Sequence, residues 1–168
     1  PDLSALLDRI LDFPTSTAEH AMIPRSRVDA IAGDTPAATV LTRMASGHTR
    51  YPVSGADADD IVGVIHLYDL LGTTLGADTA AQRCRPAVVV PETMPLPGVV
   101  QALADAGDEM AVVIDEYGGF AGVLTIEDLA EELVGEIDDE HDSPTQLQVT
   151  TDGDGWLVPG DLPLDEAE

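Results

Sequence analysis

The residues best suited to chemistry lie at one junction between a predicted strand and a predicted helix. There the chain reads Gly122, two residues of which the first is apolar, Thr125, two further residues and Asp128. Glycine lets a ligand approach the backbone, the threonine hydroxyl and the free N–H groups of a helix N-terminus can donate to a phosphate, and the aspartate can accept from two ribose hydroxyls. This spacing suits a ribose-phosphate. Thr125 and Asp128 also suit an ordinary helix cap that satisfies only backbone donors, and the residue types alone leave both interpretations open.

Other chemistries have little support in the sequence. The four histidines do not fall at metal-ligand spacings, and neither a nucleophile elbow nor a reactive-cysteine signature is present. The single cysteine, Cys84, has no partner for an intrachain disulfide, which is typical of a cytosolic protein. The acidic run from Glu136 to Asp142 is more typical of a solvated tail than of a specific metal site. We therefore expect a protein that is not an enzyme and has no metal site built from side chains.

The charge of the chain excludes whole classes of partner. There are 32 acidic residues and seven basic ones, all seven are arginines that precede Pro86, and the formal net charge is −25. A nucleic acid or an anionic lipid surface would meet repulsion rather than a basic patch. Such a surface attracts cations, including Mg²⁺. We expect no nucleic acid among the partners.

An internal repeat organises the chain. The block 63–70 aligns with the block 122–129, with glycine, valine, aspartate and leucine identical. The same offset, read without an insertion, pairs Val40 with Val99 and Val53 with Val112. Two copies of one supersecondary unit explain these matches better than chance does.

Each copy is predicted to run strand, helix, strand, strand, helix. Because one unit alone would leave one face of its sheet bare, two copies should pack sheet to sheet with pseudo-twofold symmetry. The hydrophobic content of 44% with only 4% aromatics favours an aliphatic interior, so the predicted fold class is α/β, of the α+β type. The predicted strands are 28–32, 51–54, 61–65, 87–90, 110–114 and 120–124, and the predicted helices are 36–46, 67–71, 97–106 and 125–134.

Further segments flank the repeats. Apolar residues at helical spacing predict an N-terminal helix at about residues 2–12, and short apolar runs at 146–150 and 155–159 predict two strands after the acidic tail. The chain has neither a signal peptide nor an apolar stretch of the roughly 18 residues that a membrane helix needs, so we expect a soluble, cytosolic chain. Its abrupt amphipathic start and abrupt stop suggest a piece excised from a longer protein. The predicted divisions are a linker helix at 1–21, repeats at 22–80 and 81–142, and, at 143–168, an acidic linker with the truncated start of a further domain.

The duplicated unit, with a Gly-x-x-(Thr/Ser)-x-x-Asp block closing each copy, resembles a pair of CBS repeats, also called a Bateman module. The wider text resembles the cytosolic part of the CNNM/CorC (hemolysin-C-like) magnesium and cobalt transport proteins. The motifs that carry this resemblance are Met22-Ile23-Pro24-Arg25, Gly47-His48-Thr49-Arg50-Tyr51-Pro52-Val53, Asp115-Glu116-Tyr117-Gly118-Gly119-Phe120 and Thr125-Ile126-Glu127-Asp128-Leu129. The segment 155–160 is similar to the opening of that family's small C-terminal domain.

The resemblance implies a nucleotide site. It implies that the module binds ATP, or ADP or AMP, often with Mg²⁺ held through the phosphates. In this sequence Asp128 would then hold the ribose, and Thr125 and Arg50 would contact phosphates. The first copy has His66 in the threonine slot, so we expect its equivalent pocket to be empty or weak. The remaining expected nucleotide-binding residues, most of them beside the base, are Ile23, Pro24, Val28, His48, Tyr51 and Pro52.

The resemblance also implies partners and a location. It implies a homodimer formed through the CBS pairs, a membrane-spanning part upstream in the same protein, and a place at the cytoplasmic face of the cell membrane. The expected function is nucleotide-dependent regulation of a magnesium or cobalt transporter. The alternative is a structural dimerisation module whose pocket takes no ligand.

Overall fold

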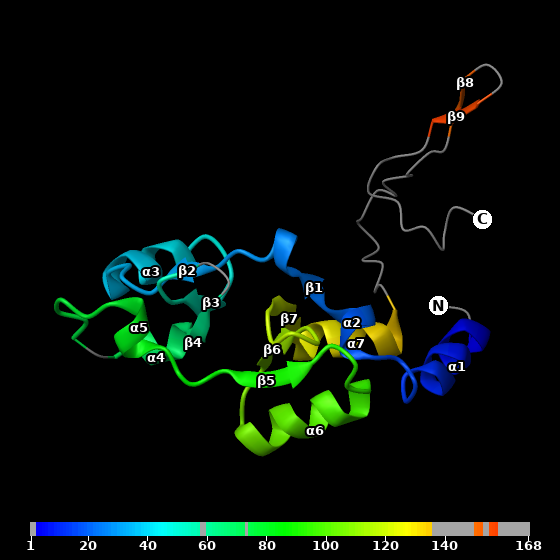
Figure 1. The fold of residues 1–168 in the computed structure, drawn as a ribbon, viewed down its shortest axis with the longest axis horizontal. Coiled ribbons are helices and arrows are strands. Elements are labelled where there is room, and N and C mark those ends of the chain that lie inside the picture. The colour runs from blue at the N-terminus through cyan, green and yellow to red at the C-terminus, as the bar shows by residue number, and fades with distance from the viewer. Residues whose placement is uncertain (1–2, 58–59, 73, 136–149, 153–154, 158–168) are drawn as a thin grey trace. The chain divides into compact units, whose positions relative to one another are not determined.

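The computed structural model describes residues 3–57, 60–72, 74–135, 150–152 and 155–157. These divide into two units, 1–136 and 137–168, and both repeats lie in the first. Helix α1 (Leu3–Asp12) confirms the predicted N-terminal helix, and it packs on α7 (Ile126–Val134). The fold is drawn in Figure 1. In the second unit, β8 (Thr150–Asp152) and β9 (Gly155–Leu157) pair antiparallel, whereas most of the predicted strand at 146–150 lies outside the described residues.

The first repeat forms a three-stranded sheet with the order β2-β3-β4. Strand β2 (Ile31–Ala32) is parallel to β3 (Arg50–Ser54), and β3 is antiparallel to β4 (Ile61–His66). Helix α3 (Ala37–Met44) covers the sheet because Ala37, Val40 and Met44 recur on one of its faces and are buried. The short helix α4 (Leu67–Leu70) ends the repeat directly after β4.

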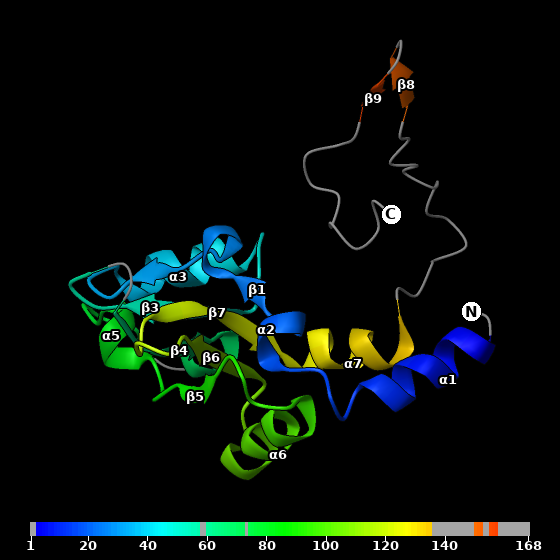
Figure 2. The same cartoon turned by 45° about the vertical axis from the view of Figure 1, so that its right-hand side comes forward.

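The second repeat builds the same unit and gains one strand. Its sheet has the order β1-β7-β6-β5, with β5 (Val88–Pro91) parallel to β6 (Met110–Ile114) and β6 antiparallel to β7 (Phe120–Thr125). Helix α6 (Leu96–Ala106) covers this sheet, and α7 follows β7 (Figure 2). The extra strand, β1 (Ile23–Pro24), pairs antiparallel with β7.

The segment 22–32 corrects a prediction. The sequence predicts a single strand at 28–32, but only Ile31–Ala32 is strand there. The chain first pairs with the second sheet as β1, then forms one turn of 3₁₀ helix, η1 (Arg25–Arg27), and only afterwards joins the first sheet. The apolar residues of this segment therefore serve two different sheets, which a single run of strand residues cannot do.

The alignment of the two copies also needs a correction. Cross-strand pairing sets His66 opposite Arg50 and Thr125 opposite Met110. Since His66 corresponds to Thr125, Arg50 corresponds to Met110, whereas the offset read from the sequence would pair it with Glu109. The helices and the last strand of the two copies therefore align at the predicted offset. Strand β3 aligns with β6 at an offset that is one residue longer. Val53 corresponds to Val113 rather than Val112, which matters because a one-residue slip turns a strand's side chains to the opposite face.

The two sheets pack face to face, as predicted. Val64 of β4 joins a buried apolar cluster with residues of β6 and β7, namely Met110, Val112, Phe120 and Val123. A separate core lies between each sheet and its own helices. The pair is therefore one α+β body in which each repeat closes the bare sheet face of the other.

Two short helices, not predicted from the sequence, lock the repeats together. Helix α2 (Ala18–Ala21) precedes the first repeat, yet the fully buried Ala18 packs in the core of the second. Helix α5 (Ala80–Arg83) precedes the second repeat, yet the fully buried Ala80 packs in the core of the first. Each repeat is therefore completed by the segment that leads into the other.

Candidate nucleotide-binding site

The N-terminus of α7 is built as a capping box. Thr125 is the N-cap, and its Oγ1 accepts a hydrogen bond of 3.3 Å from the Asp128 backbone N–H. Asp128 Oδ2 accepts from the Thr125 backbone N–H at 2.7 Å and from its hydroxyl at 2.6 Å. The predicted cap is confirmed. The box uses one carboxylate oxygen of Asp128 and leaves the other, Oδ1, outside it, so the residue can cap α7 and still offer an acceptor.

Arg50 brings a charge from the first repeat to this N-terminus. Its guanidinium donates to both carboxylate oxygens of Glu127, Nη1 at 2.7 Å and Nη2 at 3.0 Å, and Nη2 lies 2.9 Å from Oε2 of Glu109. Burial alone would lower the pKa of Arg50, but the hydrogen bond and the charges of the two glutamates and of Asp108 raise it. Arg50 is therefore a permanent cation beside the first turn of α7, and its side chain is only 14% exposed.

Sequence reasoning did not select Glu109 and Glu127 as site residues. Burial alone would raise the pKa of Glu127, but the hydrogen bond and the charge of Arg50, together with further hydrogen bonds at this helix turn, lower it below its ordinary value. A signal for Glu127 was present, because an acidic residue in a first helical turn faces the positive end of the helix dipole. No local pattern marks Glu109, which reaches Arg50 only because the two sheets meet.

The predicted residues Ile23, Pro24 and Val28 lie along the second sheet rather than at its helix junction. Ile23 faces Val123 and Pro24 faces Gly122 in the β1–β7 pairing. Ile23 and Val28 are half-buried and pack against the core between the sheets. A Cβ at position 122 would lie 2.3 Å from the Ile23 carbonyl oxygen. The glycine therefore admits strand β1, and not a ligand, to close approach.

The neighbours of Arg50 that the sequence predicts as site residues do not follow its side chain to the α7 N-terminus; they are His48, Tyr51 and Pro52. Tyr51 is 2% exposed in the core of the first repeat, and its hydroxyl accepts from the His48 backbone N–H at 3.1 Å. The exposed His48 ring meets Tyr51 edge-on, with ring centroids 5.8 Å apart. Pro52 is buried opposite Val64. Of this stretch, the side chain of Arg50 is the one that the structure brings to the α7 N-terminus.

The equivalent junction of the first repeat is filled by the protein's own side chains. His66 holds the N-cap position of α4, is 1% exposed, and stacks on Tyr68 with ring centroids 4.8 Å apart. Arg85 also lies over Tyr68, with its guanidinium carbon 4.5 Å from the ring centroid. Arg85 Nε donates to Oδ1 of Asp69 at 2.7 Å, and Asp69 is the counterpart of Asp128. These contacts support the expectation that this pocket is weak.

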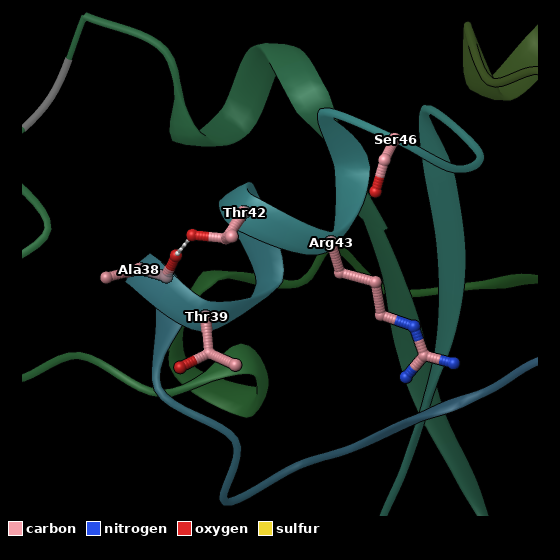
Figure 3. A pocket seen from close by; sticks show the side chains of 5 residues that line it. All are labelled: Ala38, Thr39, Thr42, Arg43 and Ser46. Atoms are coloured by element: carbon pink, nitrogen blue, oxygen red, sulfur yellow. Dashed lines mark hydrogen bonds between the residues drawn. The ribbon is translucent and has the colours of Figure 1, made fainter.

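A separate hollow lies on the outer face of α3 (Figure 3). It has a volume of about 520 Å³, and none of the predicted site residues lines it. Its charged lining residue, Arg43, forms an ion pair with Asp29. The lining residues are Ala38, Thr39, Thr42, Arg43 and Ser46. Because its lining is exposed and mostly small, we place the candidate site at α7, where polar groups from both repeats converge.

Two other kinds of site find no support among the described residues. Within them, no three His, Cys, Asp or Glu side chains are grouped closely enough to hold a metal ion. No helix in this described part of the chain is long and apolar enough to cross a membrane. The candidate site brings together the Arg50 cation, the carboxylates of Glu109 and Glu127, and the available oxygen of Asp128.

Known proteins have this arrangement of two β-α-β-β-α units, in which the segment leading into each unit packs on the other. The sequence pattern of the CBS domain family fits the chain twice, over residues 19–75 and 83–135. The chain belongs to the CBS domain family. The family is one of regulatory modules and not of enzymes, so the CBS pair is a regulatory module.

Curated relatives of the CBS pair are longer proteins. It is 41% identical over 165 residues to a UPF0053 protein of Mycobacterium tuberculosis, an alignment that covers 96% of this chain and 36% of the relative. It is 33% identical over 152 residues to the magnesium and cobalt efflux protein CorC of Vibrio cholerae, covering 88% of this chain and 52% of that protein. The chain therefore spans between about a third and about a half of these relatives.

Solved structures give the same family. The CBS domain of a bacterial CNNM/CorC family Mg²⁺ transporter superposes with a TM-score of 0.73 at 34% identity, covering 80% of this chain and 84% of that one. The same kind of domain in complex with ATP superposes with a TM-score of 0.74 at 33% identity, covering 82% of this chain and all of that one. The CBS pair is thus similar in sequence and in fold to the CBS domains of CNNM/CorC family Mg²⁺ transporters.

Proposed function

We propose that the CBS pair binds an adenine nucleotide, ATP with Mg²⁺, at the N-terminus of α7. The observation that carries this proposal is the convergence of Arg50, from the first repeat, with Thr125 and Asp128 of the second. A phosphate near a helix N-terminus is stabilised by the helix dipole, and an arginine adds a charge-assisted donor. The similar domain that was solved in complex with ATP supports the choice of ligand.

The residues fit the parts of a nucleotide in their chemistry. Asp128 Oδ1 would accept from ribose hydroxyls and Arg50 would donate to a phosphate. The Thr125 hydroxyl would donate to a phosphate in place of its bond to Asp128 Oδ2. Ile23, Pro24, Val28 and His48 would contribute to the surroundings of the base. The side chains of Tyr51 and Pro52 are buried, so these two residues would contribute to the surroundings of the base through their backbone atoms.

Electrostatics support a role for Mg²⁺. Arg50 is already shared between Glu109 and Glu127, so these three charges sum to −1 before a ligand arrives. A triphosphate adds several negative charges to a chain whose formal net charge is −25. Mg²⁺ bound through the phosphates would offset this repulsion.

For the whole protein, we propose regulation of an ion-transport part that spans the membrane. The CBS pair would lie at the cytoplasmic face, associate as a homodimer, and change its arrangement with nucleotide occupancy. A ligand can do so only if it binds two arrangements with unequal affinity. The similarity to CorC and to the CNNM/CorC regulatory domains supports this proposal. The alternative function is a dimerisation module without a ligand.

Calorimetric titration with ATP, ADP and AMP, each with Mg²⁺ and with excess chelator, tests the proposal. We expect ATP to bind with Mg²⁺ and to bind much more weakly with chelator. Thermal unfolding provides a second measurement, because a ligand at 100 times its dissociation constant adds about 2.7 kcal/mol to the free energy of unfolding. Heats equal to dilution and an unchanged midpoint for all three nucleotides would favour the dimerisation module.

A further inference from the structure

Two adjacent residues connect the α7 site to the filled pocket of the first repeat. Glu109 lies on the α7 side, where its carboxylate pairs with Arg50 and its carbonyl accepts from the Ile126 backbone N–H at 3.0 Å. Asp108 lies on the other side, with Oδ1 3.1 Å from Nε2 of His66. The two carboxylates belong to one short turn before β6, which we call the Asp108–Glu109 turn.

The Asp108 side of this turn is enclosed. The side chains of Asp108 and His66 are 7% and 1% exposed. Asp108 Oδ1 also accepts from the backbone N–H groups of Glu109, at 2.7 Å, and Met110, at 3.2 Å. His66 Nε2 lies within ion-pair reach of this oxygen but lacks the alignment of a hydrogen bond. Asp108 therefore lies against Nε2 of His66 without a hydrogen bond to it.

The Glu109 side of the turn depends on Arg50. The guanidinium contacts the Glu109 carboxylate at 2.9 Å and attracts Asp108 through space. Arg50 is also the cation that a phosphate at α7 would recruit. A ligand that draws Arg50 away removes the contacts that Arg50 makes with the turn, one at the Glu109 carboxylate and one at the Glu109 carbonyl.

We propose that the Asp108–Glu109 turn acts as a latch: while Arg50 holds the turn in place, the filled pocket around His66 in the first repeat stays closed. When a ligand recruits Arg50, the turn is released and His66 becomes accessible. The dependence of the His66 pocket on Arg50 requires only contacts within the protein and can be tested without a ligand. The claim that a nucleotide triggers the latch rests on the proposed function. Two sites that bias one two-state element are energetically coupled, and this latch would let α7 occupancy reach the first repeat.

Modification of His66 by diethyl pyrocarbonate, followed by peptide mass spectrometry, tests the latch without nucleotide. His20, whose side chain is 61% exposed, is an internal reference in every sample. Arg50→Gln and Glu109→Gln should each raise the modification rate of His66 about tenfold, since each removes a charge-assisted contact that holds the turn closed. Amide exchange at Met110 should rise in parallel, whereas exchange at Val99 in the second core should not.

Glu127→Gln is the matched control, because it removes the other carboxylate partner of Arg50 and leaves the turn intact. We expect the native His66 rate in this variant. Native rates in Arg50→Gln and Glu109→Gln, or equal acceleration in Glu127→Gln, would overturn the latch. If Arg50→Gln exchanges everywhere and is unfolded, the Glu109→Gln variant decides.

The native protein with Mg²⁺ and ATP supplies the ligand arm. Binding by calorimetry together with faster His66 modification supports the latch. Binding with an unchanged His66 rate overturns the nucleotide trigger and leaves the nucleotide site standing. If no nucleotide binds, the proposed function fails, and the variants still decide whether Arg50 holds the turn.

Discussion

The guanidinium of Arg50, on β3 of the first repeat, forms a bidentate pair with the carboxylate of Glu127, in the first turn of α7 of the second repeat. Both nitrogens of the fork are used, which is the geometry that distinguishes arginine from lysine. The pair joins the repeats at the point where a strand feeds a helix. It also makes Arg50 available beside Thr125 and Asp128, and five expected results follow from these contacts and from the packing around them.

Replacing Arg50 should weaken nucleotide binding. Arg50→Gln removes the cation beside the α7 N-terminus, and we expect the dissociation constant for Mg²⁺-ATP to rise about tenfold or more, since a hydrogen bond to a charged group contributes about 1.5–3 kcal/mol. Arg83→Gln is the control, because Arg83 pairs with Asp78 and with the Thr74 carbonyl rather than with a predicted site residue. Calorimetry should show native affinity in that control, and equal losses in both variants would point to net charge rather than to the site.

Asp128 and Asp69 occupy equivalent positions and offer a matched pair of variants. Asp128→Ala should remain folded, lose about 1 kcal/mol of stability with its capping bonds, and lose nucleotide affinity about tenfold. Asp69→Ala breaks the pair with Arg85 at the filled pocket, so we expect unchanged nucleotide affinity. Affinity that survives Asp128→Ala would remove the proposed ribose contact.

The Glu127 pair has a defined pH dependence. Burial alone would raise the pKa of Glu127, but the hydrogen bond and the charge of Arg50 act with further hydrogen bonds of the first helical turn to lower it below its ordinary value. A carboxyl with a lowered folded pKa stabilises the fold above its unfolded value of about 4.3 and loses this contribution as the pH falls through the folded value. With 63% of the Glu127 side chain exposed, screening keeps the effect to about 0.5 kcal/mol.

The measurement is urea unfolding of the native protein and of Glu127→Gln between pH 3 and pH 7. At pH 7 the variant should be slightly less stable, and the difference should shrink as the pH falls below about 4.3 toward 3. A difference that stays constant with pH would show that the charge of Glu127 plays no part.

The sequence predicted the unit and its duplication because both depend on local patterns. The apolar spacing of α3 and α6, and the Thr125 cap, follow from contacts within a few residues, and the structure confirms them. The one-residue offset between β3 and β6 could not be seen, since it is set by cross-strand pairing and leaves the strand apolar in either register.

The partners of Arg50 lay beyond local reasoning for a different physical reason. Glu109 and Glu127 come within reach only once the two sheets have packed, so no spacing along the chain reveals them. The swapped segments left a fainter trace in the sequence. Thr17, Ala18 and Pro24 recur as Thr79, Ala80 and Pro86, but their offset is longer than the one that aligns the two main blocks, so a search at the main offset passes over them.

Gly122 should be intolerant of a side chain for a packing reason. A Cβ there would lie 2.3 Å from the carbonyl oxygen of Ile23, so Gly122→Ala should break the β1–β7 pairing and cost about 1–3 kcal/mol. Gly98→Ala is the control, because position 98 is in α6 and its nearest neighbour is the flexible Met94 side chain at 3.2 Å. That substitution should be neutral or stabilising by up to about 1 kcal/mol. Equal losses of unfolding free energy in the two variants would contradict this role of Gly122.

Enlarging a buried residue of α2 should destabilise the second repeat, although the position of α2 in the sequence would suggest the first. Ala18 precedes the first repeat but is fully buried in the core of the second, in one cluster with Leu96 and Val99. Ala18→Leu overpacks that core and should cost about 1–3 kcal/mol. Amide exchange should therefore accelerate in α6 and leave α3 near its native rate. The exposed Ala38 serves as control, since Ala38→Leu adds the same side chain to the outer face of α3 without entering a core. Faster exchange confined to α3 in Ala18→Leu would mean that α2 stabilises the repeat it precedes, and the reciprocal exchange of segments would be wrong.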